Sequence, residues 1–309
     1  IEQDFPGVRT GAAGVWAETP GGAGLLLHGG VVNNAAQGDT WLYQPGLQRW
    51  TRIQTDVGPG PRSFHRLFAT PDGVVLLGGP CLDVDGAPLW RLTFQGPDTA
   101  TWTPLDPVAT LPARWCRFDA AVDGDQVWVY GGGSNGQIIE PPPLFRIRLS
   151  DGRALAIRRP VPDPTSHLSA AVAYAPDAGG LYVVGGGLPP TWDPIRRFWQ
   201  FDDDAWRELP SGTLPIVTDA RAAWLPAVRR VVVFGGAIPD YHVTDALLVY
   251  EPTLRRWSTF SSALQGRQSP GLVALPEGDA VIIHGGYGGI EESYVERDDI
   301  WRVRLSCPP

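Results

Sequence analysis

The chain has 309 residues, of which 43% are hydrophobic, and its 38 glycines, 31 prolines and 13 tryptophans predict a globular all-β protein with many turns. The formal net charge of −8 at pH 7 argues against a nucleic-acid partner, because nucleic-acid binding normally needs a basic surface. No apolar run approaches the roughly 18 to 20 residues of a membrane-spanning helix, so we expect a soluble protein with neither nucleic-acid nor membrane partners.

Two missing residue types exclude further chemistry. All 25 basic residues are arginines, which excludes a Schiff-base lysine and a phosphate-loop lysine, and the lack of methionine excludes a thioether metal ligand. The three cysteines, Cys81, Cys116 and Cys307, have spacings that predict neither a disulfide framework nor a metal knuckle. They leave the localisation open between the cytoplasm and, if a signal peptide preceded Ile1, export.

One short element recurs six times along the chain: an apolar run that ends in Gly-Gly. The doublets stand at residues 29–30, 78–79, 131–132, 185–186, 235–236 and 285–286, so their first glycines are 49 to 54 residues apart. Each run is too short for a helix and is apolar without alternation, which predicts a strand buried on both faces. Double glycine is expected where neighbouring backbone comes close or where φ becomes positive.

Two further signals keep the same phase as the doublets. After each doublet comes a strand that carries an aromatic residue, and after a turn a Trp opens the next strand, as in Trp41 and Trp50. The third copy is degenerate, because it keeps Phe145 but lacks the later Trp. Ahead of each apolar run lies a small-residue strand that is often opened by arginine, at Arg9, Arg62, Arg114, Arg221 and Arg267. Each repeat therefore predicts four antiparallel strands.

The Gly-Gly doublet, the Tyr/Trp pair and the period near 50 resemble the kelch repeat, over about Arg9 to Leu305. The resemblance implies an all-β fold, a six-bladed kelch-type β-propeller around a central channel. A four-stranded blade cannot bury both faces until its neighbours stack on it, which agrees with that fold. We expect a single domain over residues 1–309, with repeats near 9–57, 58–108, 109–160, 161–213, 214–262 and 263–309 plus 1–8.

The ends of the chain predict how the ring closes. The sixth repeat ends with Trp301 to Leu305 and leaves no room for an outermost strand. Residues Ile1 to Pro6 stand where an outer strand precedes the arginine in other repeats. We therefore expect this N-terminal strand to pair with the last blade and close the ring, in a protein that is a monomer.

Several motifs resemble chemical sites but fit the repeat better. Residues 131–136 match a dinucleotide loop and a nucleophile elbow, yet prolines follow where either mechanism needs a helix. Residues 83–86 resemble the start of a calcium loop, but Phe94 stands where its closing Glu would be. His28 and His284 each precede a doublet in blades that closure makes neighbours, so a paired-histidine metal site is the alternative to the interblade packing that we prefer. We expect no metal and no cofactor.

The candidate site lies at the starts of the innermost strands and in the loops after the doublets. In the kelch propellers that this chain resembles, these segments line the channel mouth where ligands bind. The resemblance implies ligand contacts from Arg9, Arg62, Ser63, His65, Arg114, Trp115, Arg117, His167, Arg221, Arg267 and Tyr287. Each guanidinium offers a planar fork of donors that suits a carboxylate. The alternative is that these arginines only hydrogen-bond loop carbonyls between blades.

Two functions fit this site. The first is a ligand-binding or protein-interaction propeller that recognises an acidic small molecule or peptide at the channel mouth. The second is a channel-mouth isomerase, lyase or cyclase that uses acid–base chemistry of His65 or His167 with Asp219 or Glu291. The copper-radical and iron-triad signatures of kelch-propeller enzymes cannot be assembled around these cysteines, and a structural role in a larger assembly comes third. A shallow basin rimmed by Trp and Tyr would favour the interaction module, and a deep cavity lined by Arg and His would favour the enzyme.

Overall fold

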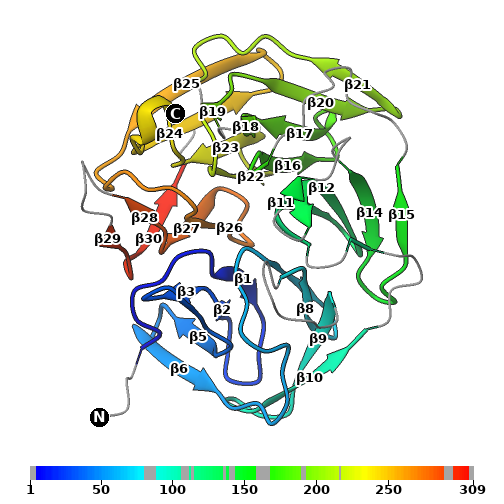
Figure 1. The fold of residues 1–309 in the computed structure, drawn as a ribbon, viewed down its shortest axis with the longest axis vertical. Helices are drawn as coiled ribbons and strands as arrows, with labels where there is room; N and C mark the ends of the chain where they lie inside the picture. The colour runs from blue at the N-terminus through cyan, green and yellow to red at the C-terminus, as the bar shows by residue number, and fades with distance from the viewer. Residues whose placement is uncertain are drawn as a thin grey trace.

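The computed structural model describes residues 5–79, 88–105, 111–112, 115–134, 137–138, 143–157, 168–188, 193–215, 217–288 and 295–305. In these residues the chain forms six antiparallel sheets that stand as blades around a central axis (Figure 1). A single 3-10 turn, η1 (Pro239–Tyr241), interrupts the β structure of the described part. None of its elements is a helix long and apolar enough to cross a membrane. The six-bladed propeller predicted from the repeats is therefore confirmed.

Blades 1 to 3 each have four main strands that run from the axis outward in chain order. Blade 1 contains β1 (Ala13–Ala17), β2 (Gly24–His28), β5 (Thr40–Gln44) and β6 (Arg49–Ile53). Blade 2 contains β7 (Arg66–Thr70), β8 (Gly73–Leu77), β9 (Leu89–Phe94) and β10 (Ala100–Pro104). Blade 3 contains β11 (Trp115–Asp123), β12 (Gln126–Ser134), β14 (Leu144–Arg148) and β15 (Ala154–Ala156), and β13 (Gln137–Ile138) pairs with β12.

Blades 4 and 5 repeat this order, and blade 6 has three strands in the described residues. Blade 4 contains β16 (Ala171–Ala175), β17 (Gly180–Val184), β20 (Phe198–Asp202) and β21 (Ala205–Glu208). Blade 5 contains β22 (Arg221–Leu225), β23 (Arg230–Phe234), β24 (Ala246–Glu251) and β25 (Arg256–Ser261). Blade 6 contains β26 (Gly271–Ala274), β27 (Ala280–His284) and β30 (Ile300–Arg304).

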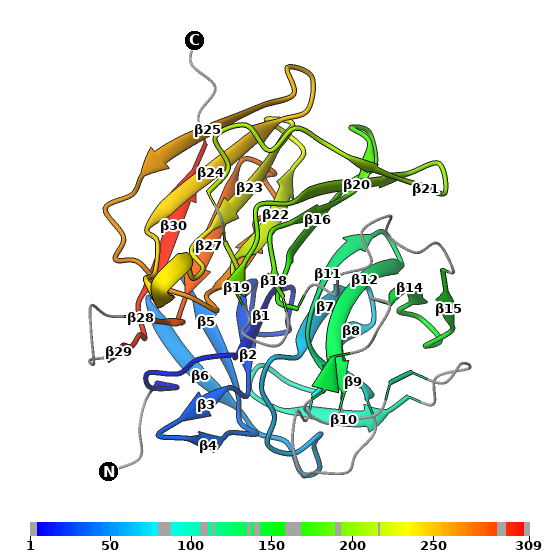
Figure 2. The same ribbon diagram turned by 45° about the horizontal axis from the view of Figure 1, so that its top comes forward.

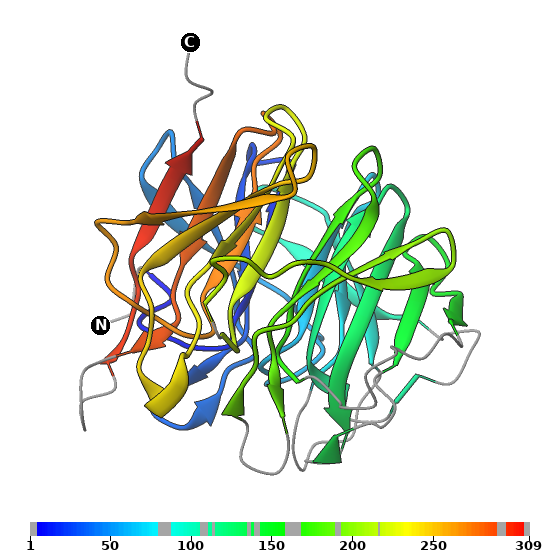
Figure 3. The ribbon, with the colours of Figure 1, turned by 90° about the horizontal axis from the view of Figure 1, so that it is seen from above.

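Three short hairpins follow the Gly-Gly doublets. They are β3 (Val31–Val32) with β4 (Ala35–Ala36), β18 (Gly187–Leu188) with β19 (Asp193–Pro194), and β28 (Tyr287–Gly288) with β29 (Val295–Glu296). Seen from the side, these hairpins lie at one face of the ring, and the turns between first and second strands lie at the other (Figure 3). We call the first the Gly-Gly face and the second the turn face.

Each interface between two blades has its own hydrophobic cluster, and the six clusters follow one another around the ring. The second strands supply much of this core, since every residue of β2 and β27 is buried. The strands that end in Gly-Gly are therefore buried on both faces, as predicted. The sixth cluster packs Leu25 of blade 1 against Val273 and Ile282 of blade 6.

The ring is closed between blades 1 and 6. Strand β1 contacts β7 on one side and β26 on the other, and the Arg9 backbone N–H donates to the Arg297 carbonyl at 3.4 Å. Figure 2 shows the first and the last blade side by side. The predicted closing strand falls largely on residues 1–4, which lie outside the described residues. The third blade has the shortest outer strand, the three-residue β15, which carries no Trp to cover its neighbours.

Candidate functional site

The Gly-Gly doublets hold neighbouring blades together through the backbone. The second glycine donates its N–H to a carbonyl at the start of the next blade, from Gly30 to Arg62 at 2.9 Å and from Gly236 to Arg267 at 2.8 Å. The first glycine has no room for a side chain, because a Cβ on Gly185 would stand 2.1 Å from the Val217 carbonyl oxygen. Both glycines of this doublet also have positive φ, of 64° and 110°. The close approach of neighbouring backbone and the positive φ, which the sequence analysis expected at the doublets, are therefore both present.

In blades 2, 3 and 6 the residue that supplies this carbonyl also donates a side-chain hydrogen bond within its own blade, whereas in blade 5 it is Val217, which has no side-chain donor. Arg62 Nη1 donates to the Gly78 carbonyl at 2.9 Å, and Arg267 Nη1 donates to the Gly285 carbonyl at 3.2 Å. In blade 3 the same contact is made by Trp115, whose Nε1 donates to the Gly131 carbonyl at 3.0 Å. We call this two-sided contact the interblade link. In each link, the second glycine of one blade donates to the backbone carbonyl of the linking residue. The side chain of that residue then donates to the carbonyl of the first glycine in the next blade.

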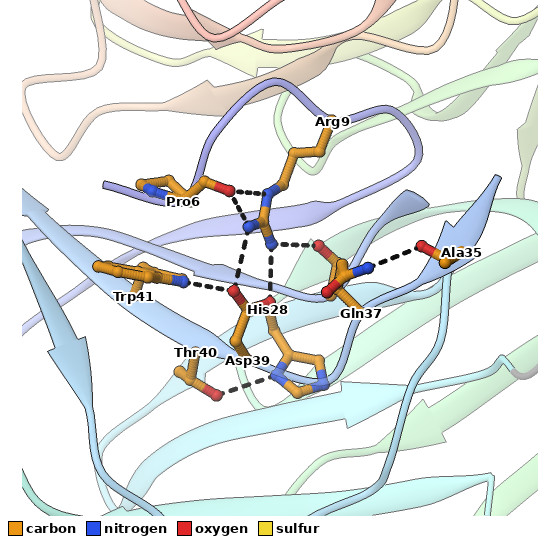
Figure 4. A network of polar contacts seen from close by, with 9 residues as sticks. Pro6, Arg9, His28, Ala35, Gln37, Asp39, Thr40 and Trp41 are labelled. Atoms are coloured by element: carbon orange, nitrogen blue, oxygen red, sulfur yellow. Dashed lines mark hydrogen bonds and ion pairs between the residues drawn. The ribbon is translucent and has the colours of Figure 1, made fainter. Parts of the chain in front are cut away.

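Two arginines that donate to the first glycine of their own blade, Arg9 to Gly29 and Arg267 to Gly285, also bind a carboxylate. Arg9 donates through Nη1 and Nη2 to the two oxygens of Asp39, at 2.8 and 3.1 Å, and Trp41 donates to the same aspartate at 2.6 Å (Figure 4). Arg267 binds Asp299 in the same bidentate way, and Trp301 Nε1 donates to that aspartate. Burial alone would raise the pKa of Asp39, but the hydrogen bonds from Arg9 and Trp41 lower it below its ordinary value. These guanidinium groups are thus committed to protein acceptors.

Three buried histidines, His28, His65 and His284, lie between blades close to the interblade links. His28 is fully buried, donates or accepts at Nδ1 with the Thr40 hydroxyl at 2.9 Å, and meets His65 edge-on with ring centroids 5.4 Å apart. Burial, with neighbouring Arg62, lowers the pKa of His28 to about 3, and burial lowers that of His65 well below 6.5. His284 packs against Gly14 and Gly271 instead. His28 and His284 therefore occupy successive interfaces, and no group of three metal-ligating side chains occurs in the described part of the chain.

A ring of residues with positive φ surrounds the channel at the Gly-Gly face, one from each blade. Five of the six donate their backbone N–H to the carbonyl of the ring residue in the preceding blade, at 2.8 to 3.4 Å. The φ angles lie between 50° and 64°, and the residues are Gly11, Phe64, Arg117, Ser169, Asp219 and Ser269. Because only one of the six is glycine, the other five hold a left-handed conformation that costs free energy, which the ring of hydrogen bonds offsets.

Three side chains of this ring cover the channel end at the Gly-Gly face. The Phe64 ring lies against Gly11, where an added Cβ would be 3.1 Å from it, and the Arg117 guanidinium stacks on Phe64 at 4.4 Å. Arg117 of blade 3 also approaches Asp219 of blade 5, with Nη1 4.0 Å from Oδ1. Ser269 donates to the same aspartate at 3.4 Å. We call Phe64, Arg117 and Asp219 the mouth cap.

Below the mouth cap lies a cavity of about 620 Å³ that fills the centre of the propeller. All six first strands line it, and it reaches Gly124, Asp177 and Pro226 in the exposed turns of the turn face. None of the six ring residues lines it. The cavity therefore opens at the turn face and ends beneath the mouth cap.

The cavity floor is charged. Arg66, Asp119 and Arg221 stand two residues after their ring residues, at equivalent positions in blades 2, 3 and 5. Arg66 Nε donates to Asp119 Oδ1 at 2.8 Å, and the Val172 N–H donates to Oδ2 at 2.9 Å, so this aspartate is fully engaged. Arg221 is only 9% exposed and donates Nη1 to the Ala220 carbonyl. Burial, followed by repulsion from Arg66, lowers the pKa of Arg221 to about 10.

The cavity wall is apolar and aromatic nearer the turn face. Trp16, Tyr174 and Trp224 stand three residues after the floor position in blades 1, 4 and 5, and each is partly buried between blades. Val122, at the same position in blade 3, is 45% exposed. The cavity thus combines a deep charged floor with an aromatic wall.

Comparison with known proteins agrees with this architecture. No family model matches the chain. The chain is 29% identical over 174 residues to the Rab9 effector protein with kelch motifs of Bos taurus, which covers 53% of this chain and 44% of the relative. It is 22% identical over 255 residues to the putative adagio-like protein 2 of Oryza sativa subsp. japonica, which covers 80% of this chain and 34% of the relative.

The repeat geometry and the kelch-motif relative agree with each other. The chain is a six-bladed β-propeller whose repeats are similar to those of a kelch-motif protein. The matched segments span less than half the length of both relatives, so what those whole proteins do is not carried over with the fold.

Those predicted ligand residues that the structure describes do not all lie at one mouth of this propeller. Arg9, Arg62, Trp115 and Arg267 are buried interblade residues, and Ser63 and His65 are buried beside them. Tyr287 pairs through its backbone with Gln268 next to the ring. Arg117 and Asp219 lie in the mouth cap, and Arg221 lies in the cavity floor, four residues after the linking position. Arg114, His167 and Glu291 lie outside the described residues.

Some functional features have no clear sequence signal. Arg66 and Asp119 were not predicted, because their shared position becomes visible only once the positive-φ ring fixes the register of the first strands. Trp16, Tyr174 and Trp224 share a position in the same way. Cys116 is disulfide-bonded, which the cysteine spacing did not predict, and the other two cysteines lie outside the described residues.

Proposed function

We propose that this kelch propeller is a protein-interaction module that holds an acidic segment of its partner at the mouth cap. The observation that carries the proposal is Arg117, whose side chain is 44% exposed at the centre of the Gly-Gly face. Its guanidinium is oriented by stacking on Phe64, and its contact with Asp219 is long at 4.0 Å. A partner carboxylate can therefore approach closer than Asp219 does and form a bidentate pair.

Two further facts support an interaction role. The relative with kelch motifs is named a Rab9 effector protein. The short hairpins β3–β4, β18–β19 and β28–β29 surround the mouth cap on the same face and enlarge the surface that a partner chain can touch. A partner that binds here would recruit Arg117 and the hairpins, while Arg9, Arg62 and Arg267 would keep their interblade bonds.

The enzyme alternative stays a prediction that no observation favours. Of its four acid–base candidates, His65 is fully buried against His28, and Asp219 is engaged by Arg117 and Ser269. His167 and Glu291 lie outside the described residues. A mouth that is covered by its own side chains suits the docking of a surface segment better than the enclosure of a substrate.

A peptide array tests the proposal. Acidic twelve-residue peptides are printed beside counterparts in which Asn and Gln replace Asp and Glu, and the folded protein is applied to both. We expect selective binding of acidic members, at least tenfold weaker for Arg117→Glu and unchanged for Arg256→Glu, an exposed arginine of outer strand β25. Asp219→Asn should strengthen binding, because it removes the internal competitor. Equal binding of acidic and amide peptides, or unchanged binding by Arg117→Glu, would refute the proposal.

A further inference from the structure

The charge balance of the central cavity points to a ligand. Each aspartate that lines the cavity has its own arginine: Asp119 binds Arg66, Asp123 faces Arg146 at 3.7 Å, and Asp177 binds Arg229. Arg221 is the exception, because no carboxylate among the described residues lies within 4.0 Å of it. The cavity floor therefore carries one surplus positive charge.

The surplus charge is buried, which makes it costly without an anion. Arg221 is 9% exposed, and its one printed hydrogen bond goes from Nη1 to the adjacent Ala220 carbonyl. Nη2 and Nε make no hydrogen bond to the described residues, although the side chain lines the cavity. A buried cation is stabilised when an anion approaches it in a low-dielectric site. Its lowered pKa reflects the same burial.

The shape of the cavity decides what kind of anion fits. The floor lies beneath the closed mouth cap, and the only way in that the lining residues define within the described part is from the turn face, past Trp16, Val122, Tyr174 and Trp224. A hydrated inorganic anion would leave this apolar wall without a partner. An aromatic or aliphatic body would cover it, and a volume of about 620 Å³ is in the range of small-molecule sites.

We propose that the cavity binds a small amphipathic monocarboxylate, whose carboxylate pairs with Arg221 at the floor and whose apolar body lies against Trp16, Tyr174 and Trp224. This site is separate from the mouth cap, because none of the ring residues is among those that line the cavity. Arg66 also lies in the cavity floor, but its charge is paired with Asp119. We therefore expect Arg66 to help orient the carboxylate electrostatically and Arg221 to bind it directly.

Isothermal titration calorimetry with 4-phenylbutyrate tests the site, with 4-phenylbutanol as the neutral counterpart that has the same apolar body. We expect the acid to bind at least tenfold more tightly than the alcohol. Arg221→Gln should remove this preference and leave the weak binding of the alcohol unchanged, whereas Arg207→Gln, an exposed arginine of outer strand β21, should bind both like the parent protein.

A second variant keeps the test decisive if Arg221→Gln fails to fold. Val122 is exposed beside the opening, so Val122→Trp should narrow the entrance without touching the core and should weaken 4-phenylbutyrate at least tenfold. Equal affinity for acid and alcohol, or full binding by Val122→Trp, would overturn the proposal. Binding of a tripeptide with a free C-terminal Phe, without binding of 4-phenylbutyrate, would also overturn it, because the site would then belong to a chain terminus.

Discussion

The interblade link predicts that a buried arginine holds the ring together, and Arg267 offers the sharpest test. Its side chain is fully buried and donates to the Gln265 and Gly285 carbonyls and to both oxygens of Asp299. Arg267→Met keeps most of the side-chain volume but removes every donor. The Gly285 carbonyl and the Asp299 carboxylate are then left without their partners in a packed interface.

The size of the effect follows from these contacts. Removing one partner of a buried ion pair costs roughly 3 to 5 kcal/mol of folding free energy. The Asp299 side chain is 36% exposed, so water solvates part of its charge and places the expectation near the lower end, about 3 kcal/mol. Native domains have roughly 5 to 15 kcal/mol of stability, so this loss is a large share of the total.

Urea unfolding followed by tryptophan fluorescence measures the loss. The matched control is Arg302→Met, because Arg302 forms an ion pair with Glu277 but both side chains are about half exposed, 52% and 44%. A surface pair of this kind contributes roughly 0 to 1 kcal/mol. If Arg267→Met and Arg302→Met unfold at the same urea concentration, the interblade link does not stabilise the ring and the predicted ligand role of Arg267 regains its support.

Two further outcomes follow from the buried residues of the links. Burial lowers the pKa of His28 to about 3, that of His284 to about 4, and that of His65 as well, so the unfolded chain takes up protons near pH 6.5 while the folded protein does not. Each histidine should therefore cost about 1.4 kcal/mol of stability per pH unit below pH 6.5, and urea midpoints that stay constant from pH 7 to pH 5 would contradict the burial of neutral rings. Gly185→Ala should lower stability by about 3 kcal/mol, because its φ is 64° and its Cβ would stand 2.1 Å from the Val217 carbonyl oxygen. Gly212→Ala, with φ of 50° and open space around it, should lose only about 1 kcal/mol, and an equal loss at both glycines in thermal melts would show that the close approach is not what matters.

The repeat predicted the fold because its signals are local and mechanical. Buried apolar runs, the Gly-Gly doublets and the Trp residues each report on backbone geometry that every blade needs, so six copies were enough to predict the ring. The arginine at the start of each repeat was harder to interpret. Arg62 and Trp115 occupy equivalent positions, because each donates a side-chain N–H to the first glycine of its own blade. An alignment of the repeats by charged residues does not pair an arginine with a tryptophan.

The candidate site could not be predicted, because the sequence does not show which residues of each first strand face the channel. A positive φ at Phe64, Arg117 and Asp219 has no sequence signal, because glycine occupies only one of the six ring positions. That conformation decides that Arg66 and Arg221 face the channel while Arg62 faces the interface. The sequence therefore predicted arginines at the channel mouth but could not distinguish those that face the channel from those that face a neighbouring blade.

The two faces of the propeller differ in how much they contribute to holding the blades together, and this difference affects how the protein can diversify. Every interblade link and every hydrogen bond of the positive-φ ring lies towards the Gly-Gly face, whereas the turns that carry Gly124, Asp177 and Pro226 hold none of them. Substitutions in those turns can reshape the opening of the cavity while the interblade links and the positive-φ ring stay intact. Descendants of this chain are thus free to change what enters the centre from one side, while the opposite side keeps the architecture constant.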